Sequence, residues 1–419
     1  MRKKLLTALS VAVSLGLATA CAPSSSGGGG EDASSSDGPI KIGAAVSETG
    51  PYAVEGKSTK EGYELWAKKV NEEGGIDVGG TKREVEVVYY DDQSKPETAI
   101  KLTQRLISED KVDFLFGPYS SGLTIATSAI AAQYKKIMFA GAAAGTSVFE
   151  QGNEYVFSPL ALTSQYTVSG LDALKAAGAK TVGVLHSDDA PMTDIKDATE
   201  EYAEKIGMSV VSVQAVPVDA ADIKGALGQI AAKKPDVLVE AGTSVLGVLT
   251  MKTLRTLGWA PQILMIQAPT ETSFVEELGV ENTRGVMAPT QWIGSANYKG
   301  EFFGTAADYR DLYVEEYGHE PSYLPAGASA AGVALQMAVE AAGTTETEAV
   351  KKELVDLDVE TFFGPITFSA PDDPSGLVGA NLPKEMLTIQ LDEKGKQVVI
   401  APEEAAKAKM VPFAPWSER

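Results

Sequence analysis

The sequence predicts an α/β protein with two lobes, each built on a parallel sheet. Short apolar runs of strand length alternate along the chain with amphipathic stretches of helical period. Continuous apolar strands that alternate with helices are typical of parallel sheets covered on both faces. About 380 of the 419 residues follow Ile40, which exceeds the usual size of a single hydrophobic core. We therefore expect two similar lobes.

The predicted elements follow from these runs in order. The strands are expected at 40–46, 85–90, 112–117, 136–141, 181–186, 209–216, 236–242 and 262–268. The helices are expected at 60–75, 96–110, 193–207, 246–258, 305–318 and 325–343. Several helical stretches end in glycine, the usual residue just beyond a helix C-terminus. Residues 386–400 are predicted to form a β-hairpin that turns at 393–395.

The first 20 residues have the organisation of a secretory signal peptide. The basic MRKK precedes the apolar LLTALSVAVSLGL and the small residues ATA. Cys21, the only cysteine in the chain, follows directly and cannot form an internal disulfide. The site resembles a bacterial lipobox, in which the cysteine is diacylated. The alternative is ordinary A-x-A cleavage, which would leave a free thiol.

The composition restricts the classes of partner. Residues 21–39 contain the lipidation candidate and a Gly/Ser-rich stretch that predicts a flexible tether. The formal charge is −21, which does not suit nucleic acid or an anionic lipid surface as a partner. Two histidines and one cysteine leave few of the softer metal ligands, so we expect no metal and no cofactor.

Two motifs suggest chemistry that their spacing does not support. TGPYAVEGKS at 49–58 lacks the spacing of a nucleotide phosphate loop, and it would place Glu55 against the phosphates. His186, Ser187 and Asp188 are neighbours in one loop, which rarely gives a working catalytic triad, and the chain has no G-x-S-x-G motif. We therefore expect no enzymatic activity. An extracellular hydrolase stays a remote alternative.

Several stretches, in order along the chain, resemble the type I periplasmic binding proteins of the branched-chain amino-acid transporter group. They include IKIGAAVSETGPYAVEG, VDFLFGPYSSGLTIA, IMFAGAAAGTSVF and FFGPITFS. The resemblance implies solute receptors of ABC importers, with two α/β lobes joined by three crossovers. It places lobe 1 at 40–159 plus 289–366 and lobe 2 at 160–288 plus 367–410, with a tail at 411–419. In open α/β sheets, ligands bind beyond the carboxyl ends of the strands.

The resemblance assigns one end of the solute site to lobe 1. GPYSSG (117–122) lies between an expected strand and an expected helix. In the family that the chain resembles, the serine at the position of Ser121 binds the ligand carboxylate. Ser120 is its neighbour, and helix capping is the alternative role for either. In GAAAGTS, backbone groups near Ala143, Ala144 and Gly145 are expected to hold the same carboxylate. Thr146 could add a hydroxyl.

The other end departs from the family. Thr243 stands where amino-acid receptors carry an aromatic residue, and Pro191-Met192 replaces the usual aromatic-glycine pair. Gln267 or Ala268 stands where the family supplies a glutamate for the ligand ammonium. Glu55 or Asp189 could substitute. A small carboxylate, an aromatic acid or an amide is then as plausible as an α-amino acid.

Two further aromatic residues are candidates for this end of the site. Trp292 lies where the chain should cross between lobes, and Tyr323 precedes a helix on the lobe-1 side. Core packing and helix entry are their alternative roles.

The sequence thus predicts an exported, lipid-anchored solute-binding protein on the outer face of a bacterial cytoplasmic membrane. We expect a monomer that delivers its solute to ABC permease subunits. A sensory receptor with the same fold is the alternative, and the sequence does not separate the two.

Overall fold

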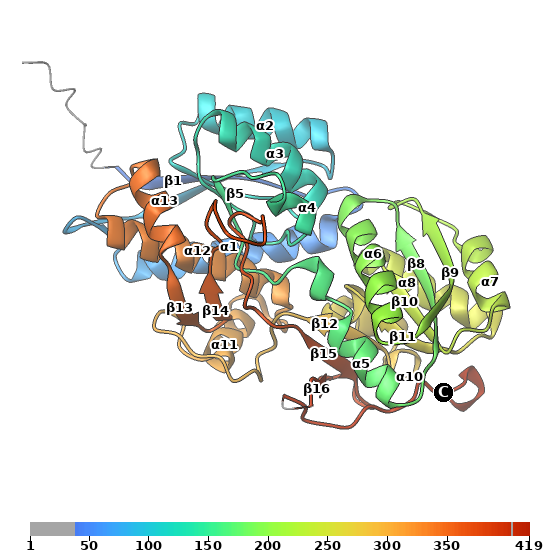
Figure 1. Cartoon of the computed structure of the whole chain (residues 1–419). Helices are drawn as coiled ribbons and strands as arrows, with labels where there is room; N and C mark the ends of the chain where they lie inside the picture. Colours follow the sequence, from blue (N-terminus) through green and yellow to red (C-terminus); the bar gives the residue numbers. More distant parts are fainter. Residues whose placement is uncertain (1–37, 404) are drawn as a thin grey trace, which may run out of the picture. The chain divides into compact units, whose positions relative to one another are not determined.

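The computed structural model describes residues 38–403 and 405–419 (Figure 1). The predicted signal peptide, Cys21 and nearly all of the predicted tether lie outside the described residues. Residues 38–419 cluster as one compact unit. Two separate large sheets provide its two lobes.

The first sheet has five strands in the order β4-β1-β5-β6-β7, and every neighbouring pair is parallel. Its strands are β1 (Ile40–Val46), β4 (Val85–Asp91), β5 (Phe114–Phe116), β6 (Met138–Phe139) and β7 (Val156–Phe157). Its helices include α1 (Ala53–Glu72), α2 (Pro96–Ser108), α3 (Ser121–Gln133), α4 (Thr146–Phe149) and α12 (Tyr323–Ala342). Strands β1, β5, β6 and β7 are almost wholly buried, as the apolar runs predict, whereas most of the edge strand β4 is only partly buried.

The second sheet has seven strands in the order β16-β15-β12-β11-β10-β8-β9. They are β8 (Thr181–Ser187), β9 (Ser209–Val216), β10 (Val237–Ala241), β11 (Gln262–Met265), β12 (Met287–Thr290), β15 (Leu387–Leu391) and β16 (Gln397–Ala401). The predicted C-terminal hairpin is confirmed as β15–β16, which extends an otherwise parallel sheet antiparallel to β12. Figure 1 shows α6, α7 and α8 beside this sheet.

The remaining elements complete the two lobes. Lobe-2 helices are α5 (Val168–Ala176), α6 (Ala190–Lys205), α7 (Lys224–Ala232), α8 (Ser244–Leu257), α9 (Thr272–Leu278) and α10 (Val280–Thr283). Other elements are β2 (Ile76–Val78), β3 (Thr81–Arg83), α11 (Ala306–Tyr317), α13 (Thr347–Val355), β13 (Asp358–Thr361) and β14 (Gly364–Thr367). Short 3-10 turns occupy Thr163–Gln165, Ala268–Thr270 and Trp416–Glu418.

Close packing of α1 against α12 fixes one side of the first lobe. A methyl group placed at Gly332 would lie 2.2 Å from the Trp66 ring, and one at Gly62 would lie 2.2 Å from the Pro325 carbonyl oxygen. Glycine is therefore required at both positions for the helices to approach this closely. Trp66 is fully buried there, as expected for a core residue.

Helix α1 begins earlier than the sequence predicts. It starts at Ala53 rather than at 60, directly after Gly50-Pro51-Tyr52. Glu55 therefore lies in the first helical turn, where an acidic side chain interacts favourably with the helix dipole. The stretch TGPYAVEG is thus a short loop followed by the start of a helix, not a loop throughout.

The chain passes between the two sheets three times. Two buried amides join these crossovers. The Ala161 N–H donates to Gln291 Oε1 at 2.6 Å, and Asn381 Nδ2 donates to the Pro159 and Pro365 carbonyl oxygens at 2.8 Å each. The expected lobe boundaries stay a prediction. Residues 369–380 hydrogen-bond to Phe149 and form a bridge at Ser158, so this segment packs beside the first sheet although the prediction places it in lobe 2.

No helix among the described residues is long and apolar enough to cross a membrane.

Candidate functional site

A small buried cavity lies between residues of the two lobes, beyond the carboxyl ends of β5, β6 and β11. Its volume is about 20 Å³, which is roughly enough for one water molecule. It is lined by Tyr119, Ser120, Ser121, Ala142, Ala144, Leu160, Thr163, Tyr166, Pro191, Met192, Ile195, Ile266, Gln267 and Tyr323. The structure therefore brings five predicted site residues to one cavity: Ser120, Ser121, Ala144, Gln267 and Tyr323.

The N-terminus of α3 forms the polar end of this cavity. Neither Ser120 nor Ser121 makes the side-chain capping bond that is the alternative role for these residues. Ser121 Oγ instead accepts a hydrogen bond of 2.8 Å from the Gly145 N–H. The first N–H groups of a helix have no partner within the helix and carry partial positive charge. This end of the cavity is therefore suited to an anionic group.

The 141–147 loop approaches α3 closely. A methyl group at Gly145 would lie 2.7 Å from Ser121 Oγ, so only glycine permits this contact. Ala144 lines the cavity, whereas Ala143 packs in an apolar cluster and its carbonyl oxygen accepts from Ser158 Oγ. Thr146 begins α4, and its Oγ1 is buried without a hydrogen-bond partner. The ligand roles expected for Ala143, Gly145 and Thr146 stay predictions.

Three tyrosines form much of the wall. Tyr119 precedes α3, Tyr166 precedes α5 and Tyr323 begins α12. The Tyr323 hydroxyl donates to Gln267 Oε1 at 2.9 Å, which joins the two lobes. Gln291 Nε2 donates to the Tyr166 hydroxyl at 2.7 Å. Burial raises the pKa of all three phenols, so they are neutral near pH 7.

Sequence reasoning missed two of these tyrosines. Tyr119 lies within the same motif as Ser121 and could have been found there. Tyr166 follows a crossover and carries no local signal. The cavity therefore has aromatic walls although Pro191 and Met192, which also line it, replace the family's aromatic residue.

Glu55 and Asp189 do not line the cavity but join the lobes beside it. The Ser244 N–H donates to Glu55 Oε1 at 2.7 Å, and the Tyr52 hydroxyl donates to Asp189 Oδ2 at 3.3 Å. Glu55 is fully buried, and its Oε2 has no partner. Burial raises the pKa of both carboxyl groups, although the hydrogen bonds that they accept act to lower it.

Two buried glutamates escaped the sequence analysis. Glu271 precedes α9, and Glu240 lies on β10; burial raises the pKa of each to about 8. Glu271 Oε1 and both carboxylate oxygens of Glu240 have no hydrogen-bond partner among the described residues. Nothing in the local pattern marks Glu240, which stands within an otherwise apolar strand. Glu271 lies four residues after the position at which the family places its glutamate.

Thr243 and Trp292 also lie outside the cavity lining. Thr243 is the N-cap residue of α8, where its hydroxyl accepts from the Leu246 N–H. Trp292 is buried against Tyr309, and its Nε1 donates to the Phe362 carbonyl oxygen at 2.9 Å. Its position agrees with the core-packing alternative. A ligand role for either residue finds no support in where it lies.

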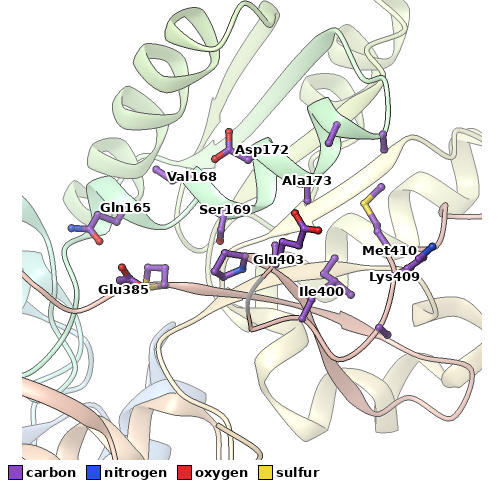
Figure 2. A pocket seen from close by; sticks show the side chains of 17 residues that line it. Gln165, Val168, Ser169, Asp172, Ala173, Glu385, Ile400, Glu403, Lys409 and Met410 are labelled. Carbon is purple, nitrogen blue, oxygen red and sulfur yellow. The ribbon is translucent and has the colours of Figure 1, made fainter. Parts of the chain in front are cut away.

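A much larger hollow of about 910 Å³ lies between α5 and the chain around β16 (Figure 2). Figure 2 shows Val168, Ser169 and Ala173 of α5 opposite Ile400, with Glu403 and Lys409 nearby. No predicted site residue lines it. We regard the small cavity as the candidate site, because it lies at strand carboxyl ends and has a helix N-terminus and polar groups that converge on it.

The described part of the chain contains no group of three or more His, Cys, Asp or Glu side chains that could hold a metal ion. The cavity lining likewise contains no charged side chain. The arrangement is therefore suited to binding an uncharged or singly anionic solute, with serine and helix N–H groups at one end and aromatic walls around its body.

Comparisons with known proteins agree with this fold. The chain is 24% identical over 378 residues to a Leu/Ile/Val-binding protein homolog of Brucella melitensis, covering 90% of this chain and 95% of that protein. An isoleucine-bound branched-chain amino-acid transporter substrate-binding protein of Streptococcus pneumoniae superposes with a TM-score of 0.76 at 22% identity, covering 87% of this chain and 100% of that one. A solute-binding protein of Rhodopseudomonas palustris with bound 3,4-dihydroxybenzoic acid gives 0.76 at 21% identity, with 89% and 99% covered. The sequence model for "Periplasmic binding protein" matches residues 39–376, so the chain belongs to the periplasmic binding protein family.

Proposed function

We propose that this chain is the substrate-binding component of an ABC importer, and that it binds a small carboxylate with an apolar or aromatic body between its lobes. The observation that carries the proposal is the cavity at the N-terminus of α3. It combines Ser121 with unpaired helix N–H groups at one end and Tyr119, Tyr166 and Tyr323 around the rest.

The solute class follows from the charges around the cavity. An α-amino acid needs an anionic partner for its ammonium group, because an unpaired buried charge is poorly held. Gln267 provides an amide at this end, whereas the carboxyl groups of Glu55, Asp189 and Glu271 do not line the cavity. Relatives with this fold carry isoleucine in one case and 3,4-dihydroxybenzoic acid in another. The uncharged lining favours the second kind of solute.

Lobe movement is part of the proposal. A cavity of about 20 Å³ cannot admit even a small organic acid, so the lobes must separate for entry. The hydrogen bonds that join them in this structure include Tyr52 to Asp189, Ser147 to Asp194, Ser244 to Glu55 and Tyr323 to Gln267. A bound solute would favour the closed arrangement to the extent that it contacts both lobes.

A thermal-shift screen of the full chain tests the proposal. The screen compares proteinogenic amino acids with aromatic acids, short aliphatic acids, amides and urea. A solute that binds only the folded chain raises its melting temperature by mass action. We expect the largest shifts from carboxylates that lack an α-amino group. Stabilisation by branched-chain amino acids alone would contradict the proposed solute class, and no stabilisation by any of these solutes would contradict the binding function.

A further inference from the structure

Two carboxyl groups from opposite lobes are buried together beside the solute cavity. Glu55 lies in the first turn of α1, and Glu271 precedes α9 in the second lobe. Glu55 is fully buried and Glu271 is 9% exposed. Each has one carboxylate oxygen without a hydrogen-bond partner, Oε2 in Glu55 and Oε1 in Glu271. Each contacts the opposite lobe, because the Ser244 N–H at the start of α8 donates to Glu55 Oε1 and Ser322, which precedes α12, interacts with Glu271.

The groups that face this pair offer no compensating cation. Glu55 is surrounded by Asp189, Tyr52 and Tyr119, which directly precede α6, α1 and the Ser120 N-cap of α3. Around Glu271 stand Ser322 and Gln267, together with Glu61, Tyr313 and Tyr323. The basic side chain His319 lies 3.5 Å from Glu61 and is itself exposed. No ion pair joins Glu55 or Glu271 to a basic side chain in the described part of the chain.

Burial without a cation disfavours the charged form of both groups. Loss of hydration raises the pKa of Glu271 to about 8, and the charge of Glu55 adds to this shift. Burial likewise raises the pKa of Glu55, while the Ser244 N–H opposes the shift. When the lobes separate, both carboxyl groups regain water and their pKa values should return toward about 4.5.

We propose that closure of the two lobes takes up protons on Glu55 and Glu271, so that the closed form is favoured as the pH falls. The proposal rests on the proposed opening and closing of a solute-binding cleft. It adds a coupling that the solute cavity does not require: between pH values of about 5 and 8, protonation and closure promote each other, and alkaline conditions favour opening and release.

The sign follows from the two pKa values of each group. A carboxyl group with a higher pKa in the closed form binds more protons there than in the open form, so its contribution to closure is fully present below about pH 4.5. That contribution is lost as the pH rises. For Glu271, the loss is complete once the pH passes the closed-form pKa of about 8. The closed-to-open ratio then falls by up to about tenfold per pH unit for each proton taken up.

The test measures the distance between lobes without any solute. Dyes are attached at Lys101→Cys on α2 and Glu201→Cys on α6, two exposed positions on different lobes, in a full chain that also carries Cys21→Ser. Energy transfer between the dyes is recorded from pH 5 to pH 9. We expect the closed fraction to fall as the pH rises. Glu271→Gln should reduce by about one the number of protons taken up on closure, so the closed fraction should depend less steeply on pH. At pH 8 this variant should have a larger closed fraction than wild type.

Glu240→Gln is the matched control. Glu240 is also fully buried, but it lies within the second lobe. Its carboxylate lies beside Gly242 and Gly247 of the same lobe. Glu240 stands on a central strand between β8 and β11 of the second sheet, so we expect this variant to keep the wild-type slope. The proposal is overturned if the distance does not change with pH, if Glu271→Gln keeps the full slope, or if Glu240→Gln loses it. Circular dichroism at each pH verifies that every variant is folded. Because no solute is added, these outcomes are independent of whether the solute screen succeeds.

Discussion

Ser121 is the residue on which the candidate site depends most. Its hydroxyl oxygen accepts from the Gly145 N–H, which fixes the side chain at the start of α3. Its hydroxyl proton is free to point toward a carboxylate in the cavity. The local motif GPYSSG places this residue between a strand and a helix, and the family resemblance assigns it to the ligand carboxylate. The ligand role expected for Gly145 rests on the same resemblance and stays a prediction.

We predict that Ser121→Ala weakens the binding of a carboxylate solute by roughly 1–3 kcal/mol, because a buried hydrogen-bond donor is lost. The dissociation constant measured by isothermal titration checks this. Ser128→Ala is the control, since Ser128 lies on the same helix and its hydroxyl bonds only to the Ile125 carbonyl oxygen. Equal affinities for the two variants would remove Ser121 from the site.

Glu240 gives a second residue-scale prediction, on stability. Its pKa is raised by burial to about 8. Its contribution to folding is therefore fully present below about pH 4.5 and is lost as the pH rises toward 8. We expect the melting temperature of wild type to fall by several degrees more than that of Glu240→Gln between pH 5 and pH 8.5. If the melting temperatures of wild type and Glu240→Gln change equally with pH, the ionisation of Glu240 does not affect stability.

At the scale of elements, the sequence predicts what depends on neighbouring residues. Most strands of both sheets lie near the expected runs because continuous apolar segments must be buried, but the short strands β7 and β12 lie outside those runs. The sequence places the start of α1 too late, because Gly50 and Pro51 favour a longer loop than the structure has. The contacts that join the crossovers could not be predicted, because Gln291 finds Ala161 and Tyr166 only after both lobes have formed.

The crossovers provide the prediction at this scale. Gln291→Ala removes the partner of the buried Ala161 N–H, which should cost roughly 1–3 kcal/mol of stability. Denaturant unfolding measures the loss. Gln151→Ala serves as the control, because Gln151 is exposed and its side chain bonds to the Ser147 carbonyl oxygen of the preceding helix α4. If both variants unfold alike, Gln291 does not stabilise the crossover.

The whole chain has a net charge of −21, and its described part forms two α/β lobes. The family follows from motifs spread over most of the chain. The solute does not, because the cavity is lined by side chains such as Tyr119, Tyr166 and Tyr323 that the fold brings together from distant segments. The sequence shows the departures from the family at Gln267 and Thr243. It does not show which solute those departures select.

Export and anchoring yield a prediction for the intact chain. If Cys21 is lipidated, Cys21→Ser should move the protein from the membrane fraction to the soluble fraction of the producing cells. Immunoblots of the two fractions measure this. Retention of the variant in the membrane fraction would show that another feature anchors it.

The location of a bound solute tests the central claim most directly. A crystal structure of the full chain with the strongest stabilising carboxylate from the screen would provide it. We predict that the carboxylate lies about 3 Å from Ser121 and the N–H groups that open α3, with its body against Tyr119, Tyr166 and Tyr323. A solute bound instead in the hollow between α5 and β16, with the space between the lobes unoccupied, would contradict the account.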